Sequence, residues 1–225
     1  MTANETEELV RRAAHDLKGP VRRMSSFAGF LREDLGDALT DDVERDLRYI
    51  IEGAEELNGL LEGLTDLALA GCQRLQAQKS SLTQCVVRAH EALGEAGDSL
   101  TVVADEEVAA WADPTALTKV CGRLLEAAVW LAGGQAVTAS VRRSGAGEAL
   151  LELDAPGLVL AEDDRRNVFE PFYKIGERPH DPKLRLASCH SAVVRMGGRL
   201  EAEQSDAGLR LLLTLPAGPP ETAQT

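Results

Sequence analysis

Residues 15–20 read His-Asp-Leu-Lys-Gly-Pro and place a nucleophilic imidazole beside a carboxylate, early in a long predicted helix. An imidazole nitrogen can accept a phosphoryl group as a phosphoramidate and pass it to a carboxylate, a transfer that depends mostly on in-line positioning and charge neutralisation. Asp16 can accept a hydrogen bond from one ring nitrogen of His15 and leave the other as the nucleophile. We interpret His15 and Asp16 as the candidate catalytic pair. The alternative is an ordinary surface histidine beside an ordinary helix carboxylate.

Two helical segments must position this pair, and they make up a first domain over residues 1–72. Apolar residues recur at steps of three and four in both segments, which is the spacing of a packed helical bundle. They are Leu17, Val21, Met24, Ala28, Leu31 and Leu35, then Leu47, Ile50, Ala54, Leu57, Leu61, Leu64 and Ala68. Residues 36–39 form a turn, and Thr40 or Asp41 can cap the second helix. A lone hairpin leaves much of its stripe in water, so we predict a homodimeric four-helix bundle.

His15 lies two residues before Leu17, which rotates its ring away from the stripe and towards solvent. Pro20 costs roughly 3 kcal/mol in a helix interior, so either the helix begins there or a continuous helix is kinked beside the histidine. The apolar phase runs unbroken from Leu17 to Val21 and favours the continuous helix. The second helix contains three glycines that either admit another backbone or are merely tolerated: Gly53, Gly59 and Gly63.

Residues 82–216 form a second domain in which helices and strands alternate. A polar linker with a loop at 79–81 precedes it, and a disordered tail over 217–225 follows. The glycines of the 144–147 turn lack the third glycine and the following helix of a nucleotide loop, which favours a hairpin. We expect helices at 82–96, 113–131, 163–168 and 187–196, with strands at 100–103, 137–142, 149–153, 200–203 and 209–215. This order predicts an α/β sandwich of a mixed sheet and about three helices.

The composition excludes several classes of function. A formal net charge of −13 repels nucleic acid and anionic membrane surfaces. The sequence contains neither a secretory signal nor an apolar run of roughly 20 residues, so we expect a cytoplasmic protein with no membrane segment. The four cysteines are scattered, which favours reduced, buried thiols, and we predict no metal site of the chain's own.

Residues 11–70 resemble the dimerisation and histidine-phosphotransfer domain of sensor histidine kinases, whose His-box is similar to residues 15–20. Residues 82–215 are similar to the ATP-binding domain of that family. The segment 113–128 follows the N-box helix, 168–173 (Val-Phe-Glu-Pro-Phe-Tyr) closely matches the F-box, and 184–198 follows the helix after the second glycine box. The resemblance implies a helical hairpin forming a dimeric four-helix bundle, followed by a histidine-kinase-type ATPase α/β sandwich.

The departures from the family pattern fall on the nucleotide site. The N-box asparagines are replaced by Arg123 and Ala127, and an alanine cannot supply the oxygen ligand that magnesium needs. The first glycine box is similar only at Asp154, the implied adenine-reading carboxylate, and at Gly157. Residues 181–186, in place of the second glycine box, contain no glycine to admit a phosphate. The second domain is therefore predicted to be degenerate and not to use ATP.

The resemblance implies response-regulator receiver domains as partners, and a hybrid histidine kinase is a further candidate. The expected docking flank follows the histidine and comprises Lys18, Pro20, Val21, Met24 and Ser25, although Met24 could instead be core. Many family members have Thr or Asn four residues after the histidine, to orient water for dephosphorylation, where this chain has Gly19. The sequence predicts a phosphorelay phosphotransferase with no cofactor of its own, Mg²⁺ coming from the receiver. The alternatives are a non-catalytic pseudokinase adaptor that binds a regulator or a kinase, and an ATP-dependent kinase core with a divergent site.

Overall fold

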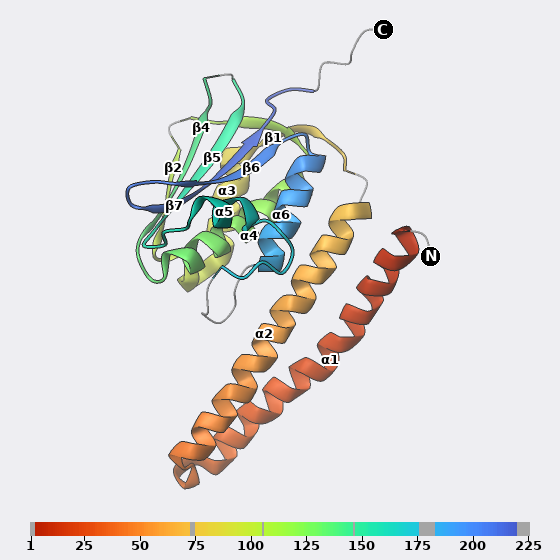
Figure 1. Cartoon of the computed structure of the whole chain (residues 1–225), viewed down its shortest axis with the longest axis vertical. Coiled ribbons are helices and arrows are strands. Elements are labelled where there is room, and N and C mark those ends of the chain that lie inside the picture. Colours follow the sequence, from red (N-terminus) through yellow and green to blue (C-terminus); the bar gives the residue numbers. More distant parts are fainter. Residues whose placement is uncertain (1–2, 73–74, 105, 146, 176–182, 220–225) are drawn as a thin grey trace.

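A computed structural model describes residues 3–72, 75–104, 106–145, 147–175 and 183–219 (Figure 1). Helices α1 (Ala3–Leu35) and α2 (Asp41–Cys72) form an antiparallel hairpin around the 3-10 turn η1 (Gly36–Ala38). Pro20 lies inside α1, so the predicted continuous helix is correct. Figure 1 shows the closed end of the hairpin projecting away from the α/β domain, while the C-terminal part of α2 lies beside α6 (Lys183–Arg195).

The core of the hairpin uses one position in every seven. The buried side chains are Ala14, Val21 and Ala28 of α1 and Leu47, Ala54 and Leu61 of α2. Of the other predicted stripe positions, Leu64 and Ala68 are half-buried in the single chain, and the rest are exposed: Leu17, Met24, Leu31, Leu35, Ile50 and Leu57. The predicted stripe is therefore split: one layer closes the hairpin and a second layer stays open to solvent.

The α/β domain contains a five-stranded mixed sheet in the order β2-β4-β5-β7-β6. Only β2 and β4 pair in parallel, and the other neighbours are antiparallel. The strands are β2 (Leu100–Ala104), β4 (Val137–Arg143), β5 (Ala149–Pro156), β6 (Arg199–Gln204) and β7 (Gly208–Leu215). The helices are α3 (Leu82–Leu93), the 3-10 turn η2 (Gly94–Gly97), α4 (Pro114–Ala132), the short α5 (Glu162–Asn167) and α6. This confirms the predicted sandwich, in which β4 and β5 pair antiparallel as a hairpin.

One face of the sheet is apolar because alternate residues of its strands are buried against the helices. Leu151 and Leu153 of β5 and Leu211 and Leu213 of β7 are at most 1% exposed. Helices α3, α4 and α6 supply the opposing apolar side chains of the same core. Residues that alternate with these leucines lie on the outer face of the sheet, away from the helices.

A second, two-stranded sheet was missed in the sequence. Residues 79–81, predicted as a loop, belong to β1 (Gln78–Ser81), which pairs antiparallel with β3 (Ala109–Ala112). The Ser80 hydroxyl donates a hydrogen bond to the Ala112 carbonyl. Residues 79–81 therefore belong to a strand and not to a loop. Of the predicted tail, residues 220–225 lie outside the described part of the chain.

Asp113 fixes the start of α4 and the approach of the linker. Its carboxylate accepts hydrogen bonds from the backbone N–H groups of Thr115 and Ala116, as an N-cap does, and from that of Gln76. Burial alone would raise the pKa of Asp113, but these three hydrogen bonds outweigh burial and lower it. The linker is thereby tied to the N-box-like helix.

Gly63 brings the two domains into close contact. A methyl group at this position would come within 2.4 Å of the Leu184 Cβ in α6. Gly63 therefore admits another backbone, whereas nothing lies within 4 Å of a methyl group at Gly53. One of the two interpretations left open for the α2 glycines thus applies to Gly63.

We expect Gly63→Ala to lower the free energy of unfolding and Gly53→Ala to raise it. Both changes raise helix propensity by about 1 kcal/mol, but only Gly63→Ala forces α2 away from α6. Chemical denaturation of the two variants beside the parent protein measures this. A similar stabilisation in both would show that α2 and α6 do not make this contact.

Candidate functional site

His15 and Asp16 lie on the outside of the hairpin. Ala14 is buried against α2, and this fixes the rotation of α1 so that the next two side chains point outwards. Each of the two side chains is 83% exposed. His15 Nδ1 lies 3.3 Å from Asp16 Oδ1, which leaves Nε2 facing solvent. A partner can therefore reach the ring, and the carboxylate is placed to hold a proton on Nδ1.

The flank beyond the histidine is only partly available to a partner. Val21 is 2% exposed and packs in the hairpin core, so its assignment to the docking flank was wrong. Pro20 and Met24 are exposed, and Ser25 is half-buried. Lys18 Nζ lies 4.0 Å from Glu62 Oε1 of α2. The candidate docking flank is thus Lys18, Pro20, Met24 and Ser25.

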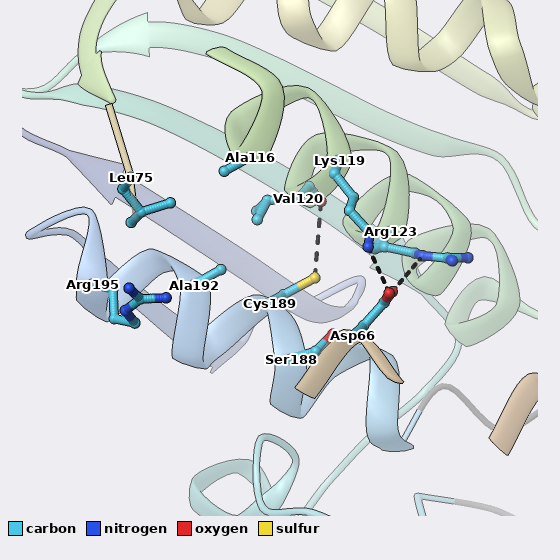
Figure 2. Close-up of a pocket in the computed structure, with 10 residues that line it drawn as sticks. All are labelled: Asp66, Leu75, Ala116, Lys119, Val120, Arg123, Ser188, Cys189, Ala192 and Arg195. Atoms are coloured by element: carbon cyan, nitrogen blue, oxygen red, sulfur yellow. Dashed lines mark hydrogen bonds and ion pairs between the residues drawn. The ribbon is translucent and has the colours of Figure 1, made fainter. Parts of the chain in front are cut away.

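Arg123, at the first N-box position, points towards the hairpin. Its Nε lies 3.4 Å from Asp66 Oδ2 and its Nη2 lies 3.7 Å from Glu62 Oε2, both on α2. Lys119, one turn earlier on α4, places Nζ 2.5 Å from Asp66 Oδ1. Figure 2 shows Asp66 pointing between the two cations. The side chain at the N-box position is occupied by contacts between the domains.

These residues border a small crevice of about 50 Å³, partly open to solvent, between α2, α4 and α6 (Figure 2). Ala192 and Cys189 of α6 lie on its other side. Burial raises the pKa of the Cys189 thiol to about 12, so this sulfur is not a nucleophile. The lining of the crevice thus combines apolar groups with cations that are already paired.

The other three nucleotide-site positions do not converge on this crevice. Ala127 is 1% exposed and belongs to the core between α4 and the sheet. Asp154 is on β5 opposite Arg210 of β7, and its Oδ1 accepts a hydrogen bond from Arg210 Nε at 2.7 Å. Both side chains lie on the outer face of the sheet, where they border a different crevice. Gly157 follows in a turn with φ of +91°, beside Gln135.

The F-box segment is folded against α6. Phe169 stacks on His190, with ring centroids 5.5 Å apart and planes 15° apart. The Tyr173 hydroxyl donates a hydrogen bond to Asp164 of α5. Phe172 is exposed and has a φ of +65°, which is rare for a residue with a side chain. His90 contacts the Gly97 carbonyl.

Part of the expected nucleotide site cannot be placed. Residues 176–182, which include His180 and the start of the second glycine box, lie outside the described residues. Within the described ranges, no group of three or more His, Cys, Asp or Glu side chains could hold a metal ion. None of the described helices is both long enough and apolar enough to cross a membrane.

Comparison with known proteins found relatives whose similarity extends over nearly the whole chain. No protein-family model matches the chain. The chain is 28% identical over 222 residues to the alginate biosynthesis sensor protein KinB of Pseudomonas aeruginosa, covering 93% of this chain and 36% of KinB. It is 27% identical to the methanogenesis regulatory histidine kinase FilI of Methanothrix harundinacea, covering 94% of this chain and 25% of FilI. The chain thus spans about a third or less of the length of these relatives.

Solved structures show the same two-part architecture. Full-length ShkA in complex with AMPPNP has a TM-score of 0.67 and 17% identity, over 93% of this chain and 45% of ShkA. The Acinetobacter baumannii histidine kinase AdeS has a TM-score of 0.60 and 17% identity, over 91% of this chain and 98% of AdeS. The fold is histidine-kinase-like. It consists of a helical phosphotransfer-type hairpin and an ATPase-type domain, in a protein similar to two-component signalling kinases.

The residues that join the two parts of this histidine-kinase-like fold were not predicted from the sequence. Glu62 and Asp66 are four residues apart on α2, and Lys119 and Arg123 are four residues apart on α4. Such i,i+4 pairs share one face of a helix. Opposite charges at equal spacing on two helices were the available signal, but spacing alone does not show that the two faces meet.

Proposed function

We propose that this chain is a histidine phosphotransferase that relays a phosphoryl group between receiver-domain aspartates through His15, without using ATP. The carrying observation is the environment of the two N-box positions. Arg123 is engaged by carboxylates of α2, and Ala127 is a buried methyl group with no oxygen to offer magnesium. The pairing of Asp154 with Arg210 on the outer face of the sheet supports the same interpretation.

The chemistry requires little beyond an accessible imidazole. Nδ1 of His15 faces the Asp16 carboxylate, so the proton is held there and Nε2 attacks phosphorus. The receiver aspartate leaves as a carboxylate, and the reverse reaction loads the next receiver. The receiver domain supplies Mg²⁺, which neutralises the charge of the transferred group. Gly19 has no side chain to orient a hydrolytic water, so we expect a long-lived phosphohistidine.

The working unit is a homodimer. The exposed layer of the hairpin contains large apolar side chains on both helices, among them Leu17, Phe27, Leu31, Ile50 and Leu57. Four of these side chains lie three residues after a buried position, and Phe27 lies next to one. Such spacing places them in the second seam of a four-helix bundle. A second copy of the hairpin offers the matching surface and buries it.

Replacing Ile50 and Leu57 by aspartate should convert the dimer to monomer, because two charges per chain would then be buried in the four-helix core. Sedimentation equilibrium measures the mass, and circular dichroism verifies that the hairpin remains helical. The control is Arg48→Asp, which also introduces an exposed carboxylate on α2. A dimer that survives the Ile50 and Leu57 changes would contradict this interface.

A receiver domain carrying labelled phosphate on its aspartate should lose the label to this protein, and His15→Ala should accept none. The loss should be complete because His15 is 83% exposed, whereas His90 and His190, the other histidines in the described residues, are half-buried. Gel separation of the two proteins over time measures the transfer. The control is Arg48→Ala, far from His15 on the hairpin, which should accept label like the parent. Label on the His15→Ala protein would overturn the assignment.

A second candidate is an ATP-dependent histidine kinase core with a divergent nucleotide site. It is favoured by the relatives, since FilI is a histidine kinase by name and ShkA was solved with AMPPNP. Stable label on His15 after incubation with labelled ATP and Mg²⁺ would select this function. A non-catalytic adaptor predicts the opposite pattern, with receiver binding that is indifferent to His15→Ala and no label from either donor.

A further inference from the structure

Six charged side chains form a continuous cluster between the hairpin and the ATPase-type domain. Arg123 contacts Glu62 and Asp66 of α2 and also Glu126 of its own helix, with Nη1 3.1 Å from Oε2. Arg185 of α6 contacts the same Glu126 oxygen at 3.2 Å. Lys119 completes the cluster through Asp66. Three helices from two domains thus meet through alternating charges.

The cluster is partly withdrawn from water, which distinguishes it from ordinary surface pairs. The Asp66 side chain is 10% exposed and that of Arg123 is 21% exposed. Burial alone would lower the pKa of Arg123, but Glu126, Asp66 and Glu62 outweigh burial and raise it. Removing one member would leave an uncompensated charge at the interface, and this would destabilise the contact between the domains.

The cluster lies beside the closest approach of the two domains. Gly63 of α2, between Glu62 and Asp66, faces Leu184, next to Arg185 in α6. Apolar contact and charge pairing therefore act on one turn of α2. The network also reaches the His-box helix, because Glu62 contacts Lys18 with its other oxygen.

We propose that Arg123 serves as an electrostatic clamp that holds the ATPase-type domain against α2, so that the first N-box position has exchanged a nucleotide contact for an interdomain one. The clamp fixes the second domain relative to His15 instead of leaving it free to carry a phosphate donor to the ring. It concerns the arrangement of the domains and stands whether or not His15 carries a phosphoryl group.

The test is small-angle X-ray scattering of the full-length chain. Arg123→Glu places a fourth carboxylate beside Glu62, Asp66 and Glu126, and we expect a larger radius of gyration as the second domain leaves α2. Arg123→Gln, which keeps most of the stem but not the charge, should shift it in the same direction by less. Adding Asp66→Arg to Arg123→Glu restores an opposite pair across the interface and should return the radius towards the parent value.

The control is Arg199→Glu, which makes the same charge change and breaks an exposed ion pair with Glu148 inside the ATPase-type domain. It should scatter like the parent protein. If Arg123→Glu fails to fold by circular dichroism, Arg123→Gln carries the test alone. Parent-like scattering from both Arg123 variants, or no recovery in the Asp66→Arg double variant, would overturn the clamp. An Arg123 variant that loses phosphotransfer but scatters like the parent protein would count against the clamp and not against the relay.

Discussion

The arrangement of this protein depends on the contact between one turn of α2 and the ATPase-type domain. Gly63 has no side chain, and Leu184 occupies the space where one would be. The close approach brings Glu62 and Asp66 within reach of Arg123 and Lys119. On α1 the result is the opposite: Ala14 is buried in the hairpin, and His15 therefore faces solvent. The rotation of α1 and α2 about their axes thus determines which side chains make contacts within the chain and which remain accessible to a partner.

The fold is histidine-kinase-like, whereas the residues at the positions expected to face a nucleotide differ from the family pattern. Ala127 is 1% exposed in the core, where a methyl group packs without needing a hydrogen-bond partner. Phe169 still packs, stacking on His190, and the sheet retains an apolar face. A fold of this kind does not by itself establish ATP use, since function depends on the groups at the site. The similarity to KinB and ShkA therefore agrees with the architecture. The reaction has to be inferred from the residues of this chain.

Local signals in the sequence predicted most elements, and non-local contacts account for what was missed. Helical periodicity located α1 and α2, and Asp113-Pro114 marked the start of α4. Residues 78–81 are short and polar, and they form a strand only because β3 lies beside them. Val21 was assigned both to the apolar stripe and to the docking flank, and only the stripe assignment agrees with its burial. Ala14, a weak hydrophobic signal, in fact sets the phase of the hairpin core. The role of Arg123 could not be predicted, since it depends on which faces of α2 and α4 meet.

The central claim is that the second domain has ceased to serve a nucleotide, and calorimetric titration tests it most directly. Titration of the chain with a non-hydrolysable ATP analogue and Mg²⁺ should give no saturable heat. The physical reasons are that Ala127 supplies no magnesium ligand and that Arg123 is held by α2. Saturable binding at one site per chain, lost when the Mg²⁺ is chelated, would contradict the account and return the protein to the ATP-dependent kinases.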